Sequence, residues 1–216
     1  MSVFTTFTKT ALAVSLAAFA LPAFAESVDF TTTGEFFCGS VAGACTATNS
    51  ATPGGSSLVI ITNNGTTNIA VAGDTYNNFI VGDPATDDLN IAQFSSTATK
   101  GAAVNTGGAE FELLITQTGP GGTQTGEFIG TFSGTVGNKS QTNGASVNFA
   151  NTTLTLGNVV YSLDAPSFSI GNPGIGTTGA NQITATVTPE PTFMLLTGFG
   201  FAAAGFVAYR RRKQAV

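Results

Sequence analysis

Apolar and polar residues alternate along much of the chain between residues 26 and 187, with a period of two. The clearest stretches place an apolar residue or a glycine at every second position: Phe111, Leu113, Ile115, and then Phe128, Gly130, Phe132, Gly134, Val136. Successive side chains of a strand point to opposite sides of a sheet, so this period predicts half-buried antiparallel strands. No stretch of the body repeats its apolar residues at helical spacing over three turns.

Turn signals join these stretches into three predicted hairpins. They are 58–62 with 66–71 around Asn63-Asn64-Gly65, 110–117 with 125–136 around the glycine-rich segment 119–122, and 152–156 with 159–163 around Gly157-Asn158. Asn-Gly and Gly-Asn pairs favour tight turns whose twist matches that of two antiparallel strands. About ten short strands with such turns predict an all-β body, an antiparallel β-sandwich with a jelly-roll-like arrangement.

The first 25 residues have the form of a secretory signal peptide. A single positive charge, Lys9, precedes an apolar run, and Pro22 ends the run before Ala23 and Ala25, which fit a small-residue cleavage site. The alternative is an uncleaved membrane helix, but a run of about a dozen residues is short for roughly 30 Å of hydrocarbon. We therefore expect export and removal of residues 1–25, which leaves a body over residues 26–187.

The C-terminal segment, residues 188–216, has three consecutive parts. Pro189, Glu190 and Pro191 come first, then an uncharged stretch over 193–209, and then the basic cluster Arg210, Arg211, Arg212 and Lys213. As a helix, the uncharged stretch would rise about 25 Å, enough for a short transmembrane span. Cations directly after a span stay on the cytoplasmic side. Taken alone, the segment fits an ordinary anchor or a stop-transfer element, and with the signal peptide it predicts a body outside the membrane.

These three parts together resemble the PEP-CTERM sorting domain, which occurs in many Gram-negative bacteria and some cyanobacteria that produce extracellular polysaccharide. The resemblance covers residues 188–213, with Thr188 where the family often has Val. It implies an exosortase-type membrane transpeptidase that recognises Pro189, Glu190 and Pro191 and removes the hydrophobic tail. It also implies an inner-membrane precursor with its body in the periplasm, and then a cell-surface or extracellular protein. It implies nothing specific about the body, because such signals follow many unrelated domains.

The body is acidic and the chain contains no histidine. Eleven Asp or Glu residues but only two lysines, Lys100 and Lys139, lie between residues 26 and 188, which gives the body a net charge of −9. Such a body repels phosphate backbones, so the charge argues against nucleic-acid binding. Without an imidazole there is no base for a Ser-His or Cys-His pair. We therefore expect the protein not to be an enzyme.

Cys38 and Cys45 are the two cysteines of the chain. In an exported protein, two cysteines seven positions apart most simply form a structural disulfide, here around a glycine-rich loop. The alternatives are a redox pair, which a C-x-x-C spacing would suit better, and half of a zinc site, which would need two further ligands.

A turn-prone loop carries Asp83, Asp87 and Asp88. Calcium takes about six to eight oxygen ligands, and loops of β-sandwiches can supply them, but the spacing here is not that of an EF-hand. The alternative is a solvated acidic turn. We expect no cofactor, with calcium at these three residues as the open alternative.

Glu110, Glu112 and Glu127 belong to the central predicted hairpin. Paired carboxylates could hydrolyse a glycoside, but far more often they form the polar side of a half-exposed sheet. The expected function is therefore that of a non-enzymatic surface or matrix component associated with exopolysaccharide or biofilm material. The alternative is a carbohydrate-binding, lectin-like module assisted by calcium, against which the absence of Trp and the presence of only three Tyr count.

Overall fold

The computed structural model describes residues 27–63, 65–81, 88–99, 104–119, 121–137, 144–170 and 179–190, together with Gly200 and Gly205. The chain divides into two compact units, of which Ser27–Thr188 is the body. The body is nearly all β, and its described residues form fifteen strands. Within the described part of the chain, no helix is both long enough and apolar enough to cross a membrane.

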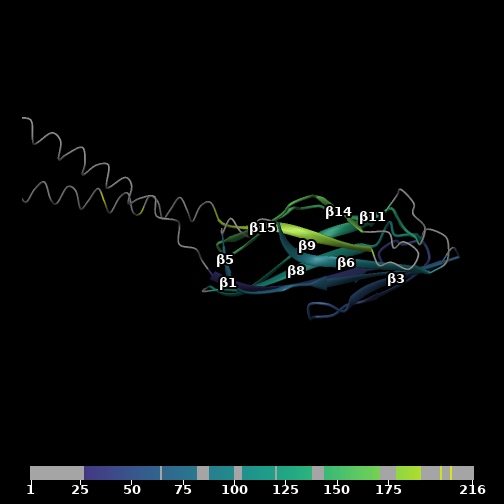
Figure 1. Cartoon of the computed structure of the whole chain (residues 1–216), viewed down its shortest axis with the longest axis horizontal. Helices are drawn as coiled ribbons and strands as arrows, with labels where there is room; N and C mark the ends of the chain where they lie inside the picture. The colour runs from purple at the N-terminus through teal and green to yellow at the C-terminus, as the bar shows by residue number, and fades with distance from the viewer. Residues whose placement is uncertain are drawn as a thin grey trace, which may run out of the picture. The chain divides into compact units, whose positions relative to one another are not determined.

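Two large sheets account for most of the body (Figure 1). Sheet A contains, in order, β14 (Ser167–Ile170), β11 (Ala145–Phe149), β9 (Gly122–Ser133), β8 (Glu110–Gly119), β1 (Ser27–Phe37) and β5 (Thr75–Ile80). Sheet B contains, in order, β12 (Thr153–Leu156), β13 (Val159–Leu163), β15 (Gly179–Pro189), β6 (Leu89–Thr99), β4 (Gly65–Gly73), β3 (Ser56–Thr62) and β2 (Ala44–Thr48). A small third sheet pairs β10 (Thr135–Val136) with β7 (Val104–Asn105). The strand pairs with a defined register are antiparallel.

The three predicted hairpins are confirmed. β3 pairs with β4, β8 with β9, and β12 with β13. Gly157, between β12 and β13, has a φ of 59°, the left-handed conformation that tight hairpin turns require. In the first hairpin Thr62 pairs with Gly65, so this glycine belongs to β4 and not to the turn in which the Asn-Gly pair was expected.

The predicted strand over 125–136 is wrong at its end, because its last three residues do not belong to β9. β9 ends at Ser133, and Gly134 is exposed and has a φ of 83°, which glycine adopts at no steric cost. Thr106 fixes the new direction of the chain, because its backbone N–H and its hydroxyl both donate to the Gly134 carbonyl, at 3.0 and 3.1 Å. The next two residues, Thr135–Val136, therefore pair in the small third sheet.

Buried side chains from both large sheets form one hydrophobic core. In β8 every second residue is buried, as the sequence period predicts. The rings of the two sheets meet at Phe94 of β6, whose centroid lies 5.0 Å from that of Phe111 in β8 and 6.5 Å from that of Phe36 in β1. Since the core fixes which sides of β1, β8 and β9 point inward, it also decides which polar side chains gather on the solvent side of sheet A.

Candidate functional site

Part of the predicted sorting signal lies within the described residues. Pro189 is the last residue of β15, and Glu190 follows it, both half-buried. Pro191 and the basic cluster 210–213 lie outside the described residues, as does the signal peptide 1–25. The predicted membrane helix over 193–209 also lies outside them, apart from its two described glycines.

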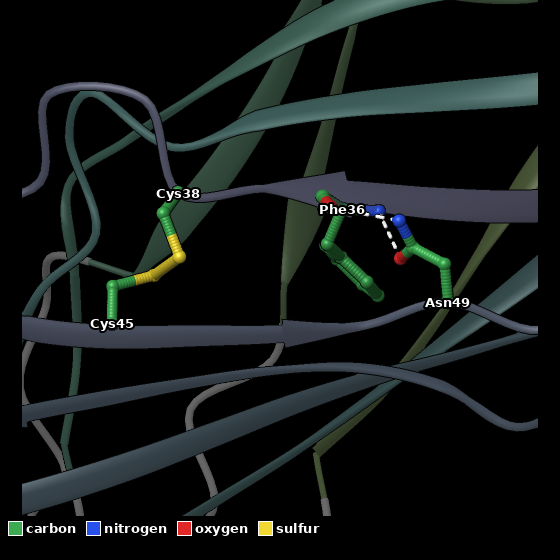
Figure 2. The surroundings of a disulfide bond; sticks show 4 residues. All are labelled: Phe36, Cys38, Cys45 and Asn49. Carbon is green, nitrogen blue, oxygen red and sulfur yellow. Dashed lines mark hydrogen bonds between the residues drawn. A yellow bond between two sulfur atoms is a disulfide. The ribbon is translucent and has the colours of Figure 1, made fainter.

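A disulfide joins Cys38, which follows β1, to Cys45 in β2, with the two Cα atoms 5.7 Å apart (Figure 2). Because β1 belongs to sheet A and β2 to sheet B, the bond connects the two sheets. Backbone hydrogen bonds hold the loop between the cysteines: the Ser40 N–H donates to the Gly108 carbonyl at 2.9 Å. Both cysteines of the chain are used in this bond, and neither is available to a zinc site.

Asn49 makes a second connection between the ends of β1 and β2 (Figure 2). Its Oδ1 accepts from the Phe36 N–H at 2.8 Å, and its Nδ2 donates to the Phe36 carbonyl at 3.1 Å. A side-chain amide that exchanges two hydrogen bonds with one backbone residue takes the place of a neighbouring strand. The sequence gives no sign of this role, because one asparagine among many in a Thr- and Asn-rich chain carries no pattern.

Four glutamates form a carboxylate cluster on the solvent side of sheet A: Glu35 of β1, Glu110 and Glu112 of β8, and Glu127 of β9. The register places Glu35 directly opposite Glu112. Glu127 stands opposite Leu114 and is therefore diagonal to Glu112, on the other flank of β8. Sequence reasoning connected the three glutamates of the hairpin but missed Glu35, because β1 and β8 are far apart in the chain.

The electrostatics of the cluster centre on Glu112, which is half-buried. Burial raises the pKa of this carboxyl above its ordinary value, and the charges of Glu127, Glu35 and Glu110 raise it further. The described residues include no Lys or Arg that would oppose these charges. Glu112 can therefore take up a proton more readily than an isolated glutamate.

Of the acidic loop that is the candidate calcium site, the structure describes only Asp88, which is exposed and has a φ of 63°. Asp83 and Asp87 lie outside the described residues. Upstream, the Asp74 carboxylate accepts from the Asn90 side-chain amide at 3.3 Å, while the buried Oδ1 of Asn90 has no hydrogen-bond partner. Within the described part of the chain, no three Asp, Glu, Cys or His residues are grouped so that they could hold a metal ion.

A buried threonine connects the sheets where the chain passes from β4 to β5. Thr32 of β1 donates its N–H to the Asp74 carbonyl at 2.9 Å, and its hydroxyl accepts from the Asp74 N–H at 2.8 Å. The same hydroxyl donates to the carbonyl of Ile91 in β6. Gly73 makes this approach possible, because a Cβ at that position would lie 1.9 Å from the Thr32 carbonyl oxygen. Sequence reasoning missed Thr32, since the alternation marks it only as one more strand residue.

A second buried polar contact crosses the core between β13 and β8. The Tyr161 hydroxyl donates to Gln117 Oε1 at 2.8 Å, and Gln117 Nε2 donates to the Leu156 carbonyl at 3.4 Å. Burial raises the pKa of Tyr161, so the phenol stays protonated. Satisfied buried polar groups of this kind fix one arrangement of a core, and they are structural here.

No protein-family model, no curated protein and no solved structure matches the chain.

Proposed function

We propose that the protein is an exported cell-surface or extracellular-matrix component, sorted through a PEP-CTERM-like signal, and that its body is a non-enzymatic structural element associated with exopolysaccharide or biofilm material. The observation that carries the proposal is the three-part pattern over 188–213, namely Pro-Glu-Pro, an uncharged stretch and four cations. An exosortase-type transpeptidase is the partner that this pattern implies.

We infer further that sheets A and B pack face to face as a β-sandwich with a jelly-roll-like arrangement. Two contacts support this inference. Rings from both sheets meet in one core around Phe94, and the hydrogen bond between Tyr161 and Gln117 crosses from one sheet to the other. Such a sandwich suits a structural surface protein. Only the inner side of each sheet forms the core, so the outer side is available for contacts with other molecules.

One feature of the body supports the proposed destination, and another limits its partners. The disulfide between Cys38 and Cys45 suits an oxidising compartment, where such bonds persist. The acidic charge of the body and its carboxylate cluster argue against a polyanionic partner such as a nucleic acid.

The sorting signal is tested by changing Pro189, Glu190 and Pro191 together to alanine and following the full chain by cell fractionation of the producing organism. We expect the variant to remain in the inner membrane, while the unchanged chain reaches the surface or the medium. Pro53→Ala, at an exposed loop position, is the control for loss of a proline and should be sorted normally. Normal sorting of the triple variant would contradict the proposed signal.

The structural role is tested separately, by deletion of the gene and by a binding assay. We expect deletion to change the extracellular matrix, and we expect the purified full chain to bind the producer's own polysaccharide. An unchanged matrix together with no binding would leave the export route intact and remove the proposed role of the body.

A further inference from the structure

The strands at the ends of the two large sheets have one side without a partner in their own sheet. These strands are β14 and β5 in sheet A, and β12 and β2 in sheet B. A free strand edge is a template for pairing with another chain, so folded proteins shorten, kink, charge or cover it. An edge that has none of these devices is open to pairing with another chain.

Three of the four end strands have a device of their own. In β5, Asn78 has a φ of 53°, and the register with β1 is irregular. In β14, the Asn181 side chain of β15 donates to the Ser169 carbonyl at 2.5 Å and covers the edge. β12 has only four residues, and Leu154 reaches across to Gly126 of sheet A. These edges are kinked, covered or short.

β2, with five residues, is hardly longer than β12, but its own sequence supplies neither a kink nor a charge. The strand, Ala44–Thr48, contains no charged residue and no proline, and it pairs on one side only, with β3. The second half of β1 is similar, because pairing with β5 ends where Thr31 meets Thr75, while β1 continues to Phe37. What lies between these two segments is the Cys38–Cys45 disulfide and the Asn49 side chain (Figure 2).

We propose that the disulfide and Asn49 form a clasp that holds β2 and the second half of β1 against each other, and that opening the clasp makes these strands a self-association surface for a second copy of the chain. The clasp protects these two strands from pairing with another chain, as a kink, a covering side chain and a short length protect the other three edges. The inference concerns assembly and is independent of the export route.

The chemistry of opening is thiol–disulfide exchange with a dithiol reductant. The reductant's thiolate attacks one sulfur of the Cys38–Cys45 bond, its second thiol completes the exchange, and the reductant leaves as a disulfide while both cysteines become thiols. The charge distribution favours a second copy at β2, because this uncharged strand presents no like charges to its own copy. Contact through the solvent side of sheet A would instead bring two carboxylate clusters together.

The test compares the full chain, in detergent micelles, with and without dithiothreitol and as the double variant Cys38→Ser, Cys45→Ser, by sedimentation velocity over a range of concentrations. We expect the association constant to rise about tenfold or more when the clasp is open, which corresponds to about 1.4 kcal/mol. Circular dichroism in the near ultraviolet shows whether the core remains folded. A folded, open chain that associates no more than the closed chain would overturn the proposal.

Two lysine substitutions locate the surface. Thr46→Lys places a charge at the centre of β2, and Thr97→Lys places the same charge on an exposed position of β6, an inner strand of sheet B. In the open chain, we expect Thr46→Lys to abolish the gain in association and Thr97→Lys to leave it. Each lysine also lowers the net negative charge of the chain. General charge repulsion alone would therefore make both substitutions increase association. Equal effects of the two substitutions would contradict an edge contact at β2.

A third variant tests the clasp even if the chain without cysteines does not fold. Asn49→Ala removes the two hydrogen bonds to Phe36 and leaves the disulfide intact. We expect a rise in the association constant that is smaller than that of the open chain and is again abolished by Thr46→Lys. An association constant unchanged from that of the native chain would count against the clasp.

Discussion

Sheets A and B share one core but differ in charge. The strands of sheet A carry Asp29, Glu35, Glu110, Glu112 and Glu127, whereas the seven strands of sheet B carry no charged residue at all. The inner sides of both sheets are built from the same kinds of apolar side chain. The packing of the core therefore does not require this difference in charge. The inner sides therefore determine the fold, while the solvent sides are free to differ in charge.

The largest expected effect comes from breaking the connection between the two sheets at Gly73. In Gly73→Ala, the added Cβ would meet the Thr32 carbonyl oxygen at 1.9 Å, so the backbone of β1 or β4 must move. We expect the free energy of unfolding to fall by at least about 3 kcal/mol, measured by denaturant titration. Gly121→Ala is the matched control, because no atom lies within 4 Å of a Cβ there, and it should cost less than about 0.5 kcal/mol.

Tyr161→Phe breaks the second polar connection between the sheets. The substitution removes the hydroxyl and leaves Gln117 Oε1 buried without its donor, which should cost about 1–3 kcal/mol in the free energy of unfolding. Adding Gln117→Leu removes the unpaired oxygen, so the double variant should lose less than the sum of the single losses. Strict additivity in this double-mutant cycle would mean that the two side chains do not act as a pair.

A new carboxylate on each sheet tests whether the difference in charge between the sheets affects stability. Thr131→Glu adds a charge on the solvent side of β9, opposite Glu110, and Thr97→Glu adds one on the solvent side of β6 in sheet B. Like charges opposite each other on neighbouring strands are destabilising, so the variant in sheet A should be less stable by about 0.5 kcal/mol than the variant in sheet B. Equal stabilities in low salt would show that the carboxylate cluster exerts no measurable repulsion.

The smallest expected effect is a change in the pH dependence of stability. Because the pKa of Glu112 is raised in the folded state, protonation of this carboxyl stabilises the fold. This stabilisation is fully present below the unfolded-state pKa of about 4.3 and is lost as the pH rises through the folded-state pKa. The melting temperature of Glu112→Gln should therefore fall less between pH 4 and pH 7 than that of the native chain. If the melting temperature of Glu112→Gln fell as steeply with pH as that of the native chain, the assigned cause would be contradicted.

Local features of the fold could be predicted from the sequence, and long-range ones could not. The hairpin of β8 and β9 follows from a period of two on both sides of a glycine-rich turn, and its pairing is confirmed. The pairing of β1 with β8 joins residues about 80 positions apart, and no local pattern records which strands become neighbours.

The same limit applies to the candidate site. Glu112 and Glu127 could be connected in advance because one hairpin carries both, but Glu35 joins them only through the pairing of β1 with β8. Asn49 was missed for a related reason, since its partner is a backbone group and not another side chain. Thr32 is chemically ordinary in the sequence, and its role depends on Gly73 bringing two backbones together.

Mass spectrometry of the mature protein from the producing organism is the most direct test of the proposed export and sorting by the two ends of the chain. We expect an N-terminus at Glu26 and a C-terminus that lacks the basic cluster 210–213. A mature chain that retains residues 1–25, or that ends with Arg210, Arg211, Arg212 and Lys213 still in place, would contradict it.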